Sequence, residues 1–592
     1  MRLLLLFATA SGWLGPPPTF RRGNTPLKSL YRVYDVGVSV GEDPGAGASP
    51  RAISDGLVAA TRKRLPRLVN VTRVVRKSLD TRKHLPRWVY VVEAEVSGKV
   101  STKQGRVERV EPEKKPKFSV KKHDKNVIVV GCGPAGLFCA LELAEQGAKV
   151  VILERGEAVE RRGADIGRLI HRKLLDPDSN FAYGEGGAGT WSDGKLTTRI
   201  GRNEADARRV LEVFVQHGAP DDILVSGAPH LGTDTLVRLL RSLRSAMMND
   251  LGIDIEFRAA VEHFETQNGR CVGVLTRDGR KFHADAVVVA AGHSADDTYA
   301  ALRDAGAKLV PKGLAVGFRI EHPQALVNKA AYGHLANRVR TGKKRTDQAN
   351  QDFLSHDLVK EHLLPVPGYR LTSHNKASNR STYSFCCCPG GQVVPASTSS
   401  DLVVVNGMSF SKRDSPFANA ALVVTVSPDD PLLDPYRSDH GPLAALAFQR
   451  DAERRAATLG GGDFVAPVSR LTDFIKAKSS KKSTTIASSY RLGVKETDCR
   501  TCYPEALNEV LIEAVLDDFE RSIPGFICDD AILHGVETRT SAPCQVERHR
   551  DSCESTTLPG LFPCGEGAGH AGGIISAAVD GIRVARALLQ HS

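Results

Sequence analysis

The glycines and the acidic residue within 127–155 are spaced as in a nucleotide-binding site, and no other segment of this sequence predicts its chemistry so directly. An apolar run ends at Gly131, and Gly133 and Gly136 complete a Gly-x-Gly-x-x-Gly turn before a helical stretch. Such glycines permit the tight turn, let a pyrophosphate approach the backbone and let the helix pack close to the strand. A second apolar run ends in Glu154, which is placed to accept hydrogen bonds from a ribose diol. The segment predicts a dinucleotide site at a helix N-terminus; an ordinary structural turn is the alternative.

The end of the chain favours FAD as that dinucleotide. Gly565 and Glu566 form a Gly-acid turn after a short strand, and such an acid can hold ribityl hydroxyls. Gly573 precedes the final helix, whose N-terminus can place N–H groups near the flavin O2 edge, where charge develops on reduction. A buried strand within 284–293 ends at Gly292 and resembles the closing strand of FAD domains in two-part flavoproteins. A glycine-rich loop before a final helix is the alternative, but it leaves the Gly565–Glu566 turn unexplained.

Five further segments carry a more specific resemblance: 181–199 (FAYGEGGAGTWSDGKLTTR), 228–234 (APHLGTD), 317–324 (GFRIEHPQ), 388–396 (CPGGQVVPA) and 535–543 (GVETRTSAP). The nucleotide-binding segments resemble the FAD domain of glutathione-reductase-like and hydroxybenzoate-hydroxylase-like flavoproteins. Together with the five segments, they resemble the uncharacterised FAD-dependent dehydrogenases, or FAD/NAD(P)-binding oxidoreductases, of bacteria and of plant and algal plastids. The resemblance covers about residues 28 to 592. It implies the fold and the cofactor more firmly than the reaction, because the substrate of that family is poorly defined.

The cofactor expected from these segments is FAD, held without a covalent bond because no attachment motif is evident. One complete Gly-x-Gly-x-x-Gly unit is present, so we expect NAD(P)H at most as a transient reductant. The residues expected to contact the cofactor are Gly131, Gly133, Pro134, Ala135, Gly136, Glu154, Arg155, Gly187, Val261, Ala291, Gly292, Gly565, Glu566, Gly573 and Ile574.

The glycine-rich segment that ends at Lys195 is the strongest candidate on the substrate side. Lys195 could stabilise negative charge at flavin N1 or bind an anionic substrate, and Ser192 or Asp193 could relay a proton. An Ω-loop that only wraps the cofactor is the alternative. Arg539 could clamp a substrate carboxylate; a buried pair with Glu537 is the alternative there. Ser192, Asp193, Lys195 and Arg539 are therefore the catalytic candidates.

The 12 cysteines do not form a disulfide framework in a chain this long, and the run 386–388 favours a reducing compartment. Redox action at Cys388 is one interpretation of that run, and simple burial is the favoured one. Cys139 has the periodicity of a core residue. Cys499 and Cys502 have thioredoxin-like spacing without a β-α setting, a second cysteine pair or a histidine set, so a chance pair is favoured and no metal site is expected.

Length and charge set outer limits on the function. A chain of 592 residues suggests two or three domains, and 41% apolar residues suffice for real cores. The net charge of +12 is uneven, because 61–125 is rich in Lys and Arg. No run reaches the roughly 18 apolar residues of a membrane-spanning helix, so no span is expected.

The N-terminal residues 1–27 have the composition of a targeting leader. A basic residue and a short apolar run precede a basic, hydroxylated segment that lacks acids. This order resembles the bipartite leaders of algae with complex plastids, so we expect a plastid protein. A merely secretory N-terminus and a cytoplasmic protein are the alternatives.

The predicted fold class is α/β: a Rossmann-like FAD-binding domain with an inserted α+β substrate domain, preceded by a small α+β, ferredoxin-like domain. The expected divisions are a leader (1–27), the N-terminal domain (28–100), a charged linker (101–124), the first FAD-binding part (125–312), the substrate domain (313–539) and the second FAD-binding part (540–592). Strand-like runs at 402–405 and 421–426 and helical runs at 443–459 and 506–521 are expected in the inserted domain.

The N-terminal domain is expected to have β-α-β-β order, with strands near 30–40, 69–76 and 88–96 and a helix capped by Ser49 with Pro50 in its first turn. Its predicted basic face consists of Arg62, Lys63, Arg64, Arg73, Arg76, Lys77, Arg82 and Lys83. RNA binding is disfavoured because an aromatic pair for base stacking is not evident. A solvated face, or docking onto the flavin domain, is favoured.

These features together predict an FAD-dependent oxidoreductase that transfers hydride or electrons between FAD and a small organic substrate. A flavin monooxygenase or an isoprenoid-type double-bond reductase is the alternative within enzymes, because these classes also carry a single FAD domain. An RNA-associated flavoprotein that uses the basic N-terminal domain is the alternative from another class, and nucleic acid is the less favoured partner. The sequence makes no prediction of oligomeric state.

Overall fold

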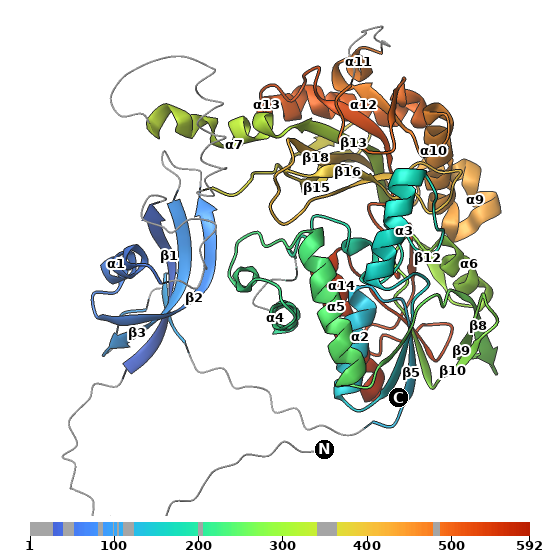
Figure 1. Cartoon of the computed structure of the whole chain (residues 1–592), viewed down its shortest axis with the longest axis horizontal. Helices are drawn as coiled ribbons and strands as arrows, with labels where there is room; N and C mark the ends of the chain where they lie inside the picture. The colour runs from blue at the N-terminus through green and yellow to red at the C-terminus, as the bar shows by residue number, and fades with distance from the viewer. Residues whose placement is uncertain are drawn as a thin grey trace, which may run out of the picture.

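A computed structural model gives the architecture of the chain (Figure 1). The structure describes residues 28–39, 53–80, 87–98, 100–102, 106–110, 123–198, 200, 205–339, 364–477 and 486–591. Several predictions lie outside these residues: the leader 1–27, Ser49 and Pro50, Arg82 and Lys83, and most of the linker 101–124. No helix among the described residues is long and apolar enough to cross a membrane.

A five-stranded parallel sheet forms the centre of the molecule. Its strands lie in the order β23-β11-β5-β6-β7, with bounds β5 (Asn126–Val130), β6 (Lys149–Leu153), β7 (Asp254–Glu256), β11 (Ala286–Val289) and β23 (Leu561–Pro563). β23 comes from the end of the chain and pairs with β11. One domain is therefore built from two distant pieces of sequence.

Helices cover this parallel sheet (Figure 1), among them α2 (Pro134–Glu145), α5 (Thr233–Asn249) and α14 (Ile574–His591). α2 and α14 approach closely, because a Cβ at Gly581 would lie 2.2 Å from the Ala135 carbonyl oxygen. The same domain includes α3 (Val159–Arg172), α4 (Ala205–Gln216), α6 (Asp296–Asp304) and an antiparallel ribbon of β8 (Val261–Gln267), β9 (Arg270–Thr276) and β10 (Lys281–His283).

The N-terminal domain is a four-stranded antiparallel sheet with one helix. Its strands pair in the order β2-β3-β1-β4, and its elements are β1 (Lys28–Ser39), α1 (Asp55–Arg64), β2 (Leu68–Asp80), β3 (Arg87–Ser97) and β4 (Val107–Arg109). The Ser54 hydroxyl accepts a hydrogen bond from the Leu57 amide at 3.1 Å, so Ser54 caps α1. The predicted cap at Ser49 is wrong for this helix, because a cap residue directly precedes the first turn.

β2 docks the N-terminal domain onto the parallel-sheet domain. The Lys77 amide donates to the Val225 carbonyl at 2.8 Å, and the Gly227 amide donates to the Lys77 carbonyl at 2.7 Å. The Lys77 side chain is buried, with its Nζ 4.4 Å from the centre of the Trp88 ring. Lys77 therefore belongs to an interior contact rather than to a continuous basic surface.

A seven-stranded sheet forms the second large layer, in the order β14-β15-β18-β13-β21-β19-β20. The strands are β13 (Leu314–Pro323), β14 (Thr372–Asn375), β15 (Arg380–Cys388), β18 (Phe417–Val426), β19 (Ala466–Arg470), β20 (Val494–Glu496) and β21 (Ile532–Glu537). The short ribbons of this region are β12 (Leu309–Pro311) with β22 (Cys544–Val546), and β16 (Gln392–Pro395) with β17 (Val405–Met408).

The helices of this region are α7 (Gln324–Val339), α9 (Asp434–His440), α10 (Ala444–Gly460), α11 (Leu471–Lys476), α12 (Glu505–Ala514) and α13 (Glu520–Ser522). Figure 1 shows α11, α12 and α13 on the side of this sheet away from the parallel-sheet domain, α7 beyond one end of the sheet, and α9 and α10 at the other end. The strand predicted at 402–405 instead begins at Val405. The helix predicted over 506–521 leaves the α-helical form after Ala514, because a π-helical stretch at Val515–Phe519 follows.

Candidate active site

A cavity of about 1490 Å³ lies between the two large sheets. One wall is the carboxyl ends of β5, β6 and β11, the position at which α/β sheets bind ligands. The opposite wall consists of β14 and β15 from the seven-stranded sheet. The volume exceeds the roughly 300–1,000 Å³ of a typical small-ligand pocket. There is room for a dinucleotide and a second, smaller molecule.

Most of the predicted cofactor contacts line this cavity. They are Gly131, Gly133, Pro134, Ala135, Glu154, Arg155, Gly187, Val261, Ala291, Gly292, Glu566, Gly573 and Ile574. Gly136 and Gly565 lie behind the wall. A Cβ at Gly136 would come 2.0 Å from the Gly131 carbonyl oxygen, and one at Gly565 would come 2.6 Å from the Ala135 Cβ. These two glycines permit close packing, and a direct contact with the cofactor is not expected of them.

The turn between β5 and α2 fits a pyrophosphate. Gly131 has a φ of +104°, which favours glycine, and a Cβ there would lie 2.4 Å from the Ala290 carbonyl oxygen. At Gly133 the nearest atom to an added Cβ is the Gly187 Cα at 3.9 Å, so the backbone faces open space. Gly133 is also the N-cap of α2 and has no side chain to bind the first N–H groups of the helix. Those N–H groups can therefore bind phosphate oxygens.

Glu154 is held rigidly at the end of β6. Its carboxylate accepts hydrogen bonds from the backbone amides of Cys132 at 2.8 Å, Gly156 at 2.8 Å and Gly184 at 3.0 Å. A carboxylate has about four acceptor positions, so capacity for a ribose hydroxyl remains. The three amides fix the carboxylate in place, which favours recognition without a loss of side-chain entropy on binding.

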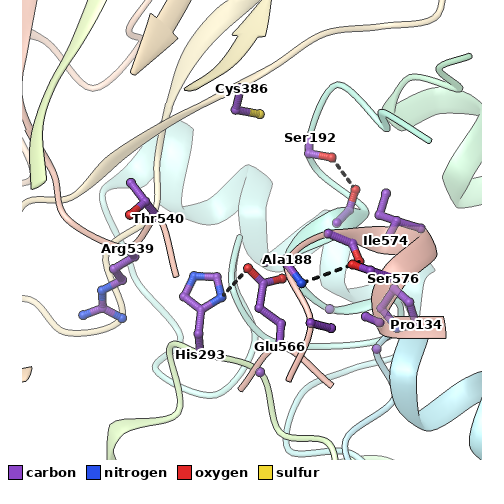
Figure 2. Close-up of a pocket in the computed structure, with 18 of the residues that line it drawn as sticks. Pro134, Ala188, Ser192, His293, Cys386, Arg539, Thr540, Glu566, Ile574 and Ser576 are labelled. Carbon is purple, nitrogen blue, oxygen red and sulfur yellow. Dashed lines mark hydrogen bonds and ion pairs between the residues drawn. The ribbon is translucent and has the colours of Figure 1, made fainter. Parts of the chain in front are cut away.

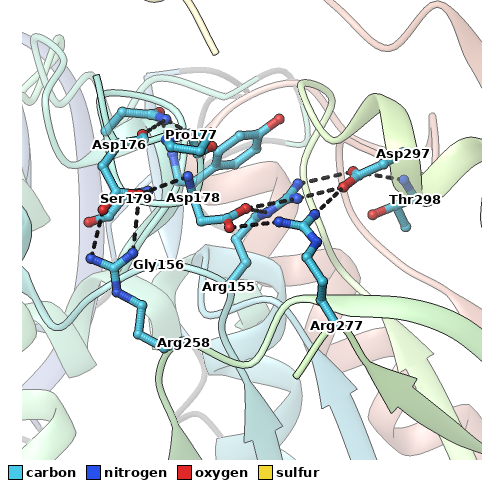
Figure 3. A network of polar contacts seen from close by, with 12 residues as sticks. Arg155, Gly156, Asp176, Pro177, Asp178, Ser179, Arg258, Arg277, Asp297 and Thr298 are labelled. Atoms are coloured by element: carbon cyan, nitrogen blue, oxygen red, sulfur yellow. Dashed lines mark hydrogen bonds and ion pairs between the residues drawn. The ribbon is translucent and has the colours of Figure 1, made fainter. Parts of the chain in front are cut away.

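Arg155 lies at the same strand end in a network of charged side chains (Figure 3). Its guanidinium donates to both carboxylate oxygens of Asp297, at 3.0 and 2.6 Å, and to Asp178 at 3.2 Å. Arg277 bridges the same two carboxylates. The network raises the pKa of Arg155, although burial opposes the shift. The guanidinium of Arg155 is engaged by two protein carboxylates. Arg155 therefore supports the cavity wall by tying together the loops that carry Asp178 and Asp297.

Arg162 organises the glycine-rich segment, and the sequence did not single it out. It is fully buried on the apolar side of α3, and its guanidinium lies 4.6 Å from the Trp191 ring. Its N–H groups donate to five backbone carbonyls, those of Asn180, Phe181, Gly184, Glu185 and Gly187. Burial lowers its pKa to about 10. An arginine at a core position of an amphipathic helix is the signal that could have identified it.

Ser192, Asp193 and Lys195 all line the cavity. Asp193 is completely buried and pairs with Arg413, and its carboxylate also accepts a hydrogen bond from the Ser409 hydroxyl. Although burial acts to raise the pKa of Asp193, Arg413 and Lys195 hold it below the usual value. These partners leave Asp193 engaged as a structural anion, which does not favour the predicted proton relay.

Ser192 and Lys195 are engaged with the backbone. The Ser192 hydroxyl donates to the Gly189 carbonyl at 2.6 Å and accepts from the Gly194 amide at 3.0 Å. The Lys195 ammonium donates to the Cys387 carbonyl and lies 3.5 Å from the Asp193 carboxylate. Lys195 thus links the glycine-rich segment to β15 across the cavity. Its pKa is raised above the usual value by nearby thiolate and carboxylate groups, although burial opposes that shift.

Arg539 faces the cavity but pairs with Glu453. Its Nε and an Nη bind the two carboxylate oxygens of Glu453 at 3.0 and 2.9 Å, and the other Nη donates to the Thr398 hydroxyl at 3.1 Å. Arg539 thus belongs to a buried Glu–Arg pair, the alternative to a substrate clamp, although its partner is Glu453 and not the nearby Glu537. Glu537 forms a separate buried pair with Arg319, at 2.8 Å.

Beside the predicted Glu566, the structure brings to the cavity two residues that were not among the predicted site residues, His293 and Cys386. His293 and Glu566 lie on the cofactor side of the cavity, with Nδ1 3.6 Å from a carboxylate oxygen, and Cys386 lies on the substrate-domain side (Figure 2). Cys388, the cysteine considered for redox action, is completely buried. His570 is held by Gln545 at Nδ1 and by the Val546 carbonyl at Nε2.

The chain matches two families of flavoproteins. Residues 126–228 and 228–340 match the family described as FAD dependent oxidoreductase, and residues 313–540 match the one described as FAD-dependent protein, C-terminal domain-like. An uncharacterized protein of Clostridium beijerinckii is 40% identical over 463 residues, which is 78% of this chain and 80% of that protein. The thiamine thiazole synthase of Thermotoga maritima is 25% identical over 177 residues, covering 29% of this chain and 56% of that one.

Solved structures of flavoproteins also align with the chain. The structure of CtdE in complex with FAD aligns with a TM-score of 0.30 and 12% identity, covering 79% of this chain and 88% of that one. The structure of a mutant of MHPCO aligns with a TM-score of 0.27 and 13% identity, covering 79% of this chain and 84% of that one.

Proposed function

The chain belongs to the family of FAD-dependent oxidoreductases, and we propose that it transfers hydride or electrons between non-covalently bound FAD and a small organic substrate. The observation that carries this proposal is the continuity of one cavity. It runs from the glycine turn and Glu154 to β14 and β15 of the seven-stranded sheet. Cofactor and substrate can therefore meet in a space enclosed by two domains.

Bound FAD supplies the redox chemistry, and the chain binds and orients the cofactor and sets the electrostatic field around it. In the proposal, Glu154 accepts hydrogen bonds from the adenosine ribose, and the N-terminus of α2 binds the pyrophosphate. Gly573 and Ile574 place the N-terminus of α14 at the cavity, where its dipole can stabilise negative charge on a reduced flavin. Arg162 keeps the glycine-rich wall in the shape that admits the ring system.

We propose that the substrate carries an acidic group. Lys195 and Arg539, the cations expected to bind it, already donate to protein acceptors. Arg370 also lines the cavity, beside β14, and among the described residues it forms no hydrogen bond or ion pair. A carboxylate at this end of the cavity would give Arg370 a partner at the cost of little reorganisation.

The experiment that tests the proposed function is anaerobic spectroscopy of the purified full-length protein. The expected protein is yellow, releases FAD on denaturation and bleaches near 450 nm when it is mixed with NADPH or with an acidic organic donor. Oxygen consumption that requires both NADPH and an added aromatic or lipid compound would favour the monooxygenase alternative. A colourless protein that does not bind added FAD would contradict the proposal.

We also propose that the chain acts in plastids. The support is the composition of 1–27, which is basic, hydroxylated and free of acidic residues after a short apolar run. Fusion of these residues to a fluorescent protein in an alga with complex plastids tests this, and cytoplasmic fluorescence would contradict it.

A further inference from the structure

The three consecutive cysteines lie at a break in the strand pairing of β15. Phe385 pairs with Ala421 and Cys388 with Asn419, so one extra residue of β15 is accommodated between the two pairs. Cys386 takes up this irregularity with a φ of +47°, in the left-handed region that favours glycine. A bulge re-aims side chains, and bulges are over-represented next to active sites.

The bulge gives the three thiols different surroundings. Cys386 lines the cavity, and Figure 2 shows its sulfur directed towards the side of the wall that carries Ser192. Cys388 is completely buried behind it, and its thiol donates to the Cys386 carbonyl at 3.4 Å. The Cys387 sulfur packs elsewhere, because a Cβ added to Gly368 would lie 3.0 Å from it. Cys386 and Cys388, which are linked by this hydrogen bond from thiol to backbone carbonyl, are called the pair below, and the Cys387 sulfur packs apart from them.

Two cations from separate parts of the chain contact the run of three cysteines. An Nη of Arg319 donates to the Cys386 carbonyl at 2.7 Å and lies 3.4 Å from the Cys388 sulfur. Lys195 donates to the Cys387 carbonyl from the glycine-rich segment. Cations beside a cysteine stabilise the thiolate, which is the form that reacts.

The surroundings of the two thiols shift their pKa values in opposite directions. A hydrogen bond from Cys388 and the charges of Lys195 and Arg319 hold the pKa of Cys386 well below its usual value, against the effects of burial and of Asp193. The hydrogen bond with Cys386 and burial raise the pKa of Cys388. A lowered pKa favours the thiolate of the cysteine that faces the cavity, and a thiolate is the form from which a disulfide is made.

We propose that Cys386 and Cys388 are a redox-active dithiol that exchanges an electron pair with the bound FAD. This inference rests on the proposed function, because FAD is the oxidant. In the forward direction the thiolate of Cys386 and the thiol of Cys388 lose two electrons, the Cys388 S–H bond breaks and a Cys386–Cys388 bond forms. The two electrons and one proton reduce FAD. In reverse, reduced FAD returns the electron pair, the S–S bond breaks, and the two sulfurs become a thiolate and a thiol.

Reductive titration of the ferricyanide-oxidised holoprotein with dithionite, under argon, tests the dithiol. The wild-type protein is expected to take up about four electrons per FAD, because the disulfide and the flavin each accept a pair. Cys386→Ser and Cys388→Ser are expected to take up about two. Cys387→Ser is the matched control and is expected to retain the uptake of the wild type.

A thiol count provides a second readout that does not depend on flavin binding by the variants. The reduced wild-type chain has 12 thiols after denaturation, and the oxidised chain is expected to have two fewer, with the bond mapped to one peptide by mass spectrometry. A wild-type protein that binds reducible FAD, takes up about two electrons and keeps every thiol would overturn the dithiol and leave the proposed function intact. A protein that binds no FAD would instead overturn the proposed function itself.

Discussion

The two ends of the cavity are built in different ways. The nucleotide end consists mainly of backbone, with glycines that leave space, amide groups and the N-terminus of α2. The substrate end is lined by side chains of β14 and β15, and buried ion pairs lie behind it: Arg319 with Glu537, and Arg539, which reaches the cavity, with Glu453. A backbone wall suits a pyrophosphate, which any chain can bind through its amide groups. A wall of side chains depends on distant residues that hold one another in place.

Substitution of Arg162 should have the largest effect on stability and on FAD binding. Its side chain holds the backbone of the nucleotide end in place. Arg162→Ala would leave five buried carbonyls without their donor, and we expect a loss of more than about 4 kcal/mol in the free energy of unfolding. FAD binding should be lost with it. Urea denaturation and FAD content measure both. Unchanged FAD binding would show that the glycine-rich segment keeps its shape without Arg162.

Substitution of Arg319 should have the next largest effect on stability. It should also separate the two ends of the cavity, because only the substrate end should be disturbed. Arg319→Ala leaves Glu537 buried and unpaired, which typically costs about 3–5 kcal/mol. FAD should still bind where the variant is folded, because the nucleotide end is built separately. A combined Arg319→Met, Glu537→Gln variant is the matched control, and it should be more stable than Arg319→Ala. Equal stability of the two would contradict an ion-pair role for Arg319.

Acid should weaken the substrate domain through His322 in β13. Its ring is completely buried, with Nε2 2.9 Å from the Phe526 carbonyl oxygen, and burial lowers its pKa to about 4. An unfolded histidine has a pKa near 6.5, so between these values the unfolded chain binds more protons and stability falls as pH falls. The expected cost at pH 5 is about 2 kcal/mol.

Urea denaturation of wild type and His322→Phe at pH 7 and pH 5 measures this effect. The wild type should lose more stability than the variant between the two values, and equal losses would contradict the assignment. The FAD affinity of the folded wild type should change little over the same range, because this histidine lies outside the nucleotide end.

The sequence predicted the nucleotide end well because its information is local. The apolar runs and three glycines lie within about one β-α-β unit, and the structure has β5, α2 and β6 at those positions. The helical run predicted at 443–459 likewise corresponds to α10. Local pattern was insufficient at the first helix, where Ser49 and Ser54 are both plausible caps and only the backbone distinguishes them.

The side-chain contacts of the substrate end could not be predicted from the sequence, because the residues that make them are far apart in the chain or identical in type. Arg539 and its partner Glu453 are 86 residues apart, and no periodicity connects them. The cysteines at 386–388 are identical in type, and only the break in the pairing of β15 turns Cys386 towards the cavity. Tertiary contacts and strand register decide these positions, and both depend on the whole fold.

The central claim is that open space at Gly133 is reserved for the pyrophosphate of FAD. The most direct test is the FAD content and affinity of purified Gly133→Val, compared with wild type and with Gly167→Ala, a glycine in α3 whose added Cβ would meet no atom within 4 Å. We expect that all three proteins fold, that wild type and Gly167→Ala bind one FAD, and that Gly133→Val binds little or none. FAD bound by folded Gly133→Val as tightly as by the wild type would contradict it.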